Sequence, residues 1–192
     1  MSELNDLKNA GIYQEWWSNP GIVGLMGFAL TTMVTGLHNA GYIGAGPTLA
    51  MALAFGGTAQ FIAGVIDLRK GNLFGGSAFM SYGAFWWSVY ALVVWLPAHG
   101  IKPDAQQVAA FFFVWAMFTF AFVLAVFKHG KFLSALFILL FLAFVLLVFK
   151  ELGKASPKLV GWEIFITGAL AWYIAMAILV NTTYGRTVLP LS

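Results

Sequence analysis

Six long apolar stretches alternate along the chain with short segments rich in glycine, proline and charge. A helix needs roughly 20 apolar residues to cross the hydrocarbon core of a bilayer, and each stretch comes close to or exceeds that length. The connecting segments are short, so consecutive helices are expected to run antiparallel. The pattern predicts six transmembrane helices, over residues 20–37, 46–66, 74–96, 105–127, 132–149 and 159–180.

The six stretches and their links take up nearly all of the sequence. We therefore expect one transmembrane domain over 20–183, between an N-terminal segment 1–19 and a C-terminal tail 184–192. Asn19 followed by Pro20 is typical of a helix start, with a side-chain cap before the residue favoured at the first helical position. More Lys and Arg residues fall at the end with both termini than at the opposite end, which favours cytoplasmic termini.

Composition agrees with a membrane protein. Hydrophobic residues make up 61% of the chain and charged residues only 9%, whereas soluble domains carry about a quarter charged residues. The absence of cysteine excludes disulfide frameworks and thiolate sites. A net charge of +3, spread thinly over termini and links, gives no nucleic-acid footprint.

Ionisable residues avoid the middle of every predicted helix. The acids lie outside the helices or, for Glu163, in a first turn, and His38, His99 and His129 lie at helix ends or in links. No nucleophile elbow, phosphate-binding loop or zinc-binding histidine pair occurs. The sequence therefore indicates neither an enzyme nor a metal or cofactor site, and it offers no mid-membrane group for proton or sodium coupling.

A path lined by hydroxyls, amides and aromatic rings does not repel an anion, so small anions or neutral solutes are the expected cargo. A Thr or Ser hydroxyl within a helix can bond the backbone of that helix instead of lining a path, so these residues are weak evidence for a path. Gln60 carries an amide instead of a hydroxyl and is therefore the most informative polar residue. The polar residues within the predicted helices are Thr31, Thr32, Thr35, Gln60, Ser81, Tyr82 and Thr119.

Five blocks of sequence carry a resemblance to a known family. They are NPGIVGLMGF at 19–28, TT and LHNAGY ending at 42, GGTAQFIAG at 56–64, KGNLFGGSAFMSYGAFW at 70–86 and GRTVLP at 185–190. They resemble the acetate uptake transporters, which include bacterial succinate-acetate permeases and fungal acetate and ammonia export proteins. The resemblance covers essentially the entire chain.

The resemblance implies a six-helix protomer in the plasma (inner) membrane, assembled into a hexameric ring with one pore in each protomer. It places the pore constriction at Phe28, Tyr82 and Leu140. Each of these lies eight residues past its predicted helix start, or about 12 Å deep, and Gln60 reaches a similar depth. The polar residues expected along the substrate path are Asn19, Thr31, Thr32, Gln60 and Ser81.

The sequence thus predicts a channel or facilitator for acetate and related small monocarboxylates, with succinate as a further substrate. An acetate-proton symporter with the same cargo is the alternative. More distant alternatives are ammonia or ammonium export and a non-transporting membrane signalling subunit. Asn181, Thr182 and Thr183 stand where many relatives have acids, which argues against proton coupling through the last helix.

Overall fold

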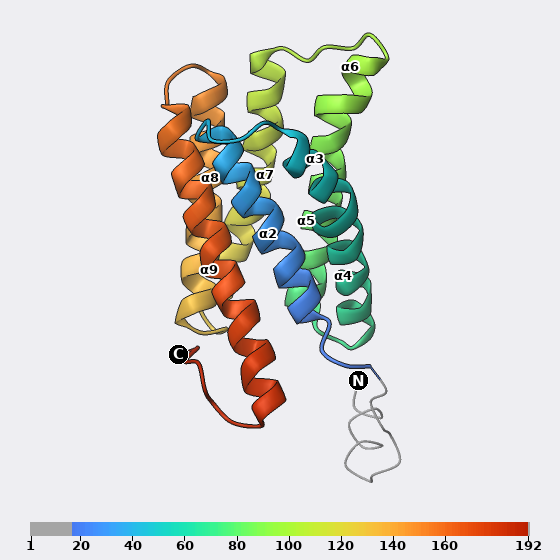
Figure 1. Cartoon of the computed structure of the whole chain (residues 1–192), viewed down its shortest axis with the longest axis vertical. Helices are drawn as coiled ribbons and strands as arrows, with labels where there is room; N and C mark the ends of the chain where they lie inside the picture. The colour runs from blue at the N-terminus through green and yellow to red at the C-terminus, as the bar shows by residue number, and fades with distance from the viewer. Residues whose placement is uncertain (1–16, 192) are drawn as a thin grey trace.

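The computed structural model describes residues 17–191. Within that range the chain folds into a bundle of six helical spans that are long and apolar enough to cross a membrane (Figure 1). This confirms the predicted all-α, multi-pass fold. The predicted ends lie within four residues of the observed ones, and the spans are Gly21–Asn39, Gly46–Arg69, Leu73–Ala98, Ala105–Val126, Lys131–Glu151 and Pro157–Tyr184.

The first span, α2 (Gly21–Asn39), begins directly after the Asn-Pro pair. The Asn19 Oδ1 atom accepts a hydrogen bond of 2.9 Å from the Gly21 amide and so satisfies one of the free N–H groups of the first turn. The helix begins one residue later than predicted, because Pro20 occupies the cap position. The predicted N-terminal segment 1–19 lies mostly outside the described residues.

The second span is not a uniform α-helix. It consists of α3 (Gly46–Leu53), a π-helical stretch η1 (Ala54–Ala59) and α4 (Gln60–Arg69). Gly57 lies in η1, where a Cβ atom would come within 2.5 Å of the Trp87 indole, so only glycine permits this close approach. The π-helical stretch ends directly before Gln60 and thereby sets the direction in which its side chain points.

The third span likewise contains α5 (Leu73–Tyr90), a π-helical stretch η2 (Ala91–Trp95) and the short α6 (Leu96–Ala98). The remaining spans are α7 (Ala105–Val126), α8 (Lys131–Glu151) and α9 (Pro157–Tyr184). The most extensive helix contact is between α2 and α9. It depends on small residues, since a Cβ atom on Gly36 would lie 2.6 Å from the Phe165 amide nitrogen.

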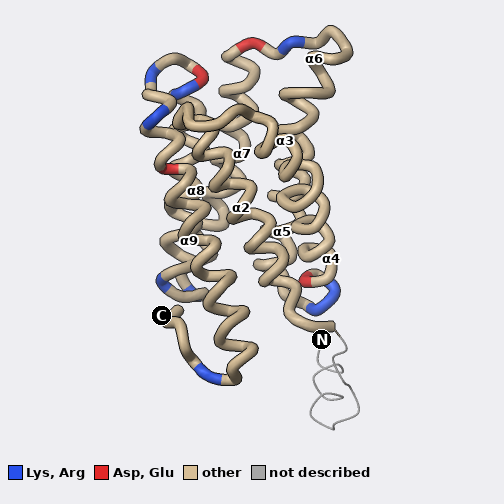
Figure 2. The backbone as a smooth tube through the Cα atoms, viewed as in Figure 1, with Lys and Arg blue, Asp and Glu red and all other residues tan. Residues whose placement is uncertain are grey.

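Charged residues of the described chain gather at the two ends of the bundle, which are called lower and upper here as they stand in Figure 2. The expectation that the acids lie outside the helices or in a first turn is wrong in detail. Helix α4 continues through Asp67, Glu163 lies in the second turn of α9, and α8 continues through Lys150 and Glu151. An apolar run marks the part of a helix that suits the hydrocarbon core, but the backbone continues helically past it.

Candidate functional site

A lower cavity of about 290 Å³ lies at the end of the bundle where the described chain begins and ends. The first turns of three helices, α2, α5 and α8, contribute to its lining. Its polar lining residues include Asn19, Gln60, Asp67, Asn72 and His129. The rest of the lining is largely aromatic and aliphatic.

An upper cavity of about 370 Å³ lies at the opposite end. The last turns of α2 and α8 line it, together with the link between α6 and α7. Its polar and charged lining residues are Thr32, Thr35, His38, Asn39, Thr48, Lys102, Lys150 and Glu151.

Two buried side chains, Phe28 of α2 and Leu140 of α8, line both cavities. They are apolar and come from two different helices. The structure thus brings together two of the three residues expected at a constriction, and it places them between a cavity that faces one end and a cavity that faces the other. This position is the apolar junction.

Tyr82, the third expected residue, lies beside the junction on its lower side. Its ring centroid is 6.0 Å from that of Phe28, and the side chain lines the lower cavity. The Thr119 hydroxyl donates to the Trp115 carbonyl at 2.8 Å, so it accepts the 2.9 Å hydrogen bond from the Tyr82 hydroxyl. The ring of Tyr82 therefore faces the cavity, while its hydroxyl is bound to α7.

Gln60 is 1% exposed and lines the lower cavity. Its Oε1 atom has no hydrogen-bond partner within the described residues. A buried amide oxygen without a hydrogen-bond partner is costly, so such a group calls for an explanation. Gln60 is therefore available to a polar solute in the cavity.

The other predicted polar residues divide between the cavities and the packing. Asn19 lines the lower cavity and Thr32 the upper cavity. Thr31 instead packs against Gly56 of η1, and a Cβ atom on that glycine would meet the Thr31 hydroxyl at 2.6 Å. Neither Thr31 nor Ser81 lines either cavity.

Sequence reasoning missed several polar groups that line the cavities. In the lower cavity the Asn72 amide donates to Asp67 at 3.0 Å, and the His129 ring stacks on Phe74 at 4.3 Å. In the upper cavity Lys150 donates to Asn39 at 2.7 Å. Lys150 and Asn39 lie on helices that are distant in the sequence, so no local sequence motif indicates the contact.

The C-terminal segment returns to the lower cavity. The Asn181 side chain accepts hydrogen bonds from the Val188 and Leu189 amides and donates to the Leu189 carbonyl. The Tyr173 hydroxyl donates to the Pro190 carbonyl, and Leu191 then lines the cavity. Asn181, which stands where many relatives have an acid, is thus one of two residues, with Tyr173, whose hydrogen bonds hold this segment against the bundle.

The fold and the two cavities define a multi-pass membrane protein with a cavity that carries polar groups toward each end and an apolar junction between them. The chain belongs to the GPR1/FUN34/yaaH family, whose model matches residues 4–191. This confirms the family resemblance seen in the sequence blocks.

Several of the similar proteins are named as transport proteins or as a channel. The succinate-acetate/proton symporter SatP of Escherichia coli strain K12 is 38% identical over 179 residues, which cover 91% of this chain and 95% of that protein. The solved structure of the bacterial acetate channel SatP matches with a TM-score of 0.87 at 38% identity and covers 92% of this chain and 99% of that chain. Ammonia transport outward protein 2 of Saccharomyces cerevisiae is 34% identical, covering 84% of this chain and 61% of that protein. These likenesses point to a non-enzymatic protein.

Proposed function

We propose that this protein is a transmembrane channel or facilitator for acetate and related small carboxylates, including succinate. A symporter and a channel for such cargo resemble it along nearly the entire chain. At the level of residues the proposal rests on one observation, the position of Phe28 and Leu140 between the two cavities. A solute that crosses the protomer from one cavity to the other passes these two side chains.

In this proposal Phe28, Tyr82 and Leu140 form the constriction. An apolar constriction rejects strongly hydrated ions because they lose water there without compensation. An idealised Born estimate puts the cost of burying a bare carboxylate on the order of 20 kcal/mol, so the dry stretch has to be short and flanked by polar groups. A small carboxylate with an apolar methyl group suits such a path better than a compact inorganic anion does.

Uncharged donors flank the junction on its lower side. The first turns of α2, α5 and α8 direct the positive ends of their helix dipoles toward the lower cavity. Asn19 and Gln60 add amide groups there, and Thr32 adds a hydroxyl in the upper cavity. These three are the substrate contacts we retain from the expected polar set, because Thr31 packs against η1 and neither Thr31 nor Ser81 lines a cavity.

Movement of the carboxylate without a coupled proton is favoured over proton symport, because the junction itself is lined by apolar groups. The acids among the described cavity-lining residues are Asp67 in the lower cavity and Glu151 in the upper cavity. Asp67 lies seven residues from Gln60 on the same helix, or about 10 Å away along the axis. Neither acid is placed to carry a proton across the apolar junction.

Ammonia or ammonium export is a second candidate, because a yeast ammonia transport protein is among the relatives. The apolar junction would admit neutral ammonia as well. A non-transporting signalling role is a further candidate. Inhibition of acetate flux by propionate but not by ammonium would argue against ammonia export, and any protein-dependent flux would argue against a purely signalling role.

The proposal is tested by entry of labelled acetate into proteoliposomes at a fixed acetate gradient. Protein-free liposomes give the baseline, and a proton ionophore collapses any pH gradient. We expect protein-dependent entry that persists when the pH gradient is removed. Strict dependence on an inward proton gradient would contradict the channel and support the symporter.

We further propose that six copies form a ring in the plasma membrane, each copy with its own path and both termini in the cytoplasm. Wide apolar faces support assembly or lipid contact, as on α7, where Phe113, Met117, Phe120 and Leu124 are exposed. We place the segment 1–19 and the tail 184–192 on the cytoplasmic side of the domain 20–183. Native mass spectrometry of the detergent-extracted protein should give six copies per particle.

A further inference from the structure

The upper cavity carries an excess of positive charge that the lower cavity lacks. Its charged lining residues are Lys102, Lys150 and Glu151, two cations against one anion, whereas the lower cavity has Asp67 alone. A carboxylate at the upper end therefore meets a different electrostatic environment from one at the lower end.

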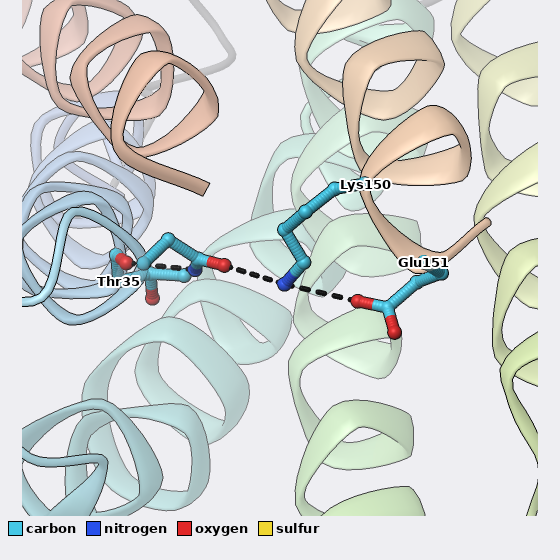
Figure 3. Close-up of polar contacts among 4 residues, drawn as sticks. Thr35, Lys150 and Glu151 are labelled. Carbon is cyan, nitrogen blue, oxygen red and sulfur yellow. Dashed lines mark hydrogen bonds and ion pairs between the residues drawn. The ribbon is translucent and has the colours of Figure 1, made fainter. Parts of the chain in front are cut away.

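Lys150 is held in position toward the cavity from two sides. Its ammonium donates to Asn39 Oδ1 at 2.7 Å on α2 and pairs with Glu151 Oε1 at 2.9 Å on its own helix (Figure 3). The Asn39 amide nitrogen donates to the Thr35 carbonyl at 2.9 Å, which leaves the amide oxygen facing the lysine. The chain of contacts from Thr35 to Glu151 thus fixes where the charge lies.

The ammonium of Lys150 retains capacity for a further ligand. An ammonium group has three protons, and the two contacts above use two of them. The side chains of Lys150 and Glu151 are 22% and 23% exposed, so the pair is accessible from the cavity. The Glu151 carboxylate also shows, within the molecule, that a carboxylate fits against this ammonium.

We infer that Lys150 is the carboxylate-binding residue of the upper cavity, with Glu151 as a tethered competitor for the same ammonium. This inference rests on the proposed function and deepens it. A carboxylate arriving at the upper end binds the free proton of the ammonium or displaces Glu151, and it then lies ahead of the apolar junction. Asn39 is a positioning residue, because it acts by orienting Lys150.

The test uses concentration-dependent acetate entry into proteoliposomes of wild type and three variants. Lys150→Met removes the charge but keeps the apolar stem. Glu151→Gln removes the competing carboxylate. Lys154→Met is the matched control, because Lys154 is exposed at the same end of the bundle and lines neither cavity.

We expect Lys150→Met to raise the half-saturating acetate concentration about threefold to fivefold, the size typical of a partly exposed ion pair, with the maximal rate nearly unchanged. Glu151→Gln should lower the same concentration, and Lys154→Met should leave it within error of wild type. A general structural defect would instead lower the maximal rate of both cavity variants. Affinity changes of opposite sign are therefore not what a structural defect produces.

The inference is overturned if Lys150→Met behaves like Lys154→Met, or if Glu151→Gln weakens acetate affinity. Failure of the proposed function looks different, because wild-type proteoliposomes would then take up no more acetate than protein-free liposomes. Normal wild-type flux with an ineffective Lys150→Met would reject the lysine site and leave the path through the junction intact.

Discussion

At the scale of residues, the proposed path depends on which side chains reach a cavity. The resemblance placed Phe28, Tyr82 and Leu140, and the structure brings all three to one region of the bundle. The sequence could not show which of Thr31 and Thr32 lines a cavity. Adjacent helical residues point about 100° apart, so one faces the second span and the other the upper cavity.

Phe28→Ala should raise acetate flux severalfold and admit larger monocarboxylates such as butyrate, because loss of the ring joins the two cavities. A buried Phe→Ala change also costs about 3–5 kcal/mol of stability, so Phe85→Ala, at a buried ring that lines the upper cavity alone, is the control. Initial rates for acetate and butyrate are compared at equal amounts of folded protein. Unaltered size selectivity in Phe28→Ala would show that Phe28 is not part of the constriction.

Tyr82→Phe should leave acetate flux within about twofold of wild type, because the hydroxyl is bound to Thr119 and the ring alone faces the cavity. Loss of that hydrogen bond should lower the free energy of unfolding by about 1 kcal/mol. Thr119→Val should cost a similar amount, and the double variant should cost less than the sum of the two. A large loss of flux in Tyr82→Phe, with assembly intact, would mean that the hydroxyl contacts the substrate.

At the scale of elements, the length of each apolar run predicted every span. Unpaired backbone N–H and C=O groups are costly in lipid, and an α-helix pairs these groups within one segment. Their ends were harder to place, because charged residues such as Lys150 and Glu151 prolong a helix beyond the apolar run. The π-helical stretch before Gln60 was not predicted, because the extra residue in a π-helical turn does not change the amino-acid composition of the segment. The pairing of Lys150 with Asn39 depends on tertiary structure alone.

Asn181→Ala should release the C-terminal segment, because three hydrogen bonds to Val188 and Leu189 are lost together. We expect faster trypsin cleavage after the exposed Arg186, followed by mass spectrometry, with the rest of the bundle resistant. Thr183→Ala is the control, since that hydroxyl bonds within its own helix, to the Leu179 carbonyl. Equal cleavage rates in both variants would show that Asn181 does not hold the segment.

At the scale of the whole molecule, the charge distribution favours cytoplasmic termini. The sequence has no cysteine, so a single introduced thiol reports topology without background. In intact cells, a membrane-impermeant maleimide should label Lys154→Cys, at the upper end, and should label Arg186→Cys, near the C-terminus, only after the cells are opened. The reverse pattern would invert the proposed orientation.

The central claim is that small carboxylates cross each protomer through the apolar junction between the two cavities. The most direct measurement is the current across a planar bilayer that holds the purified protein, with acetate at unequal concentrations on the two sides. A channel predicts a protein-dependent current that reverses near the acetate equilibrium potential and increases in Phe28→Ala. An electroneutral acetate-proton symporter would carry acetate without current, and protein-dependent acetate flux with no current would contradict the account.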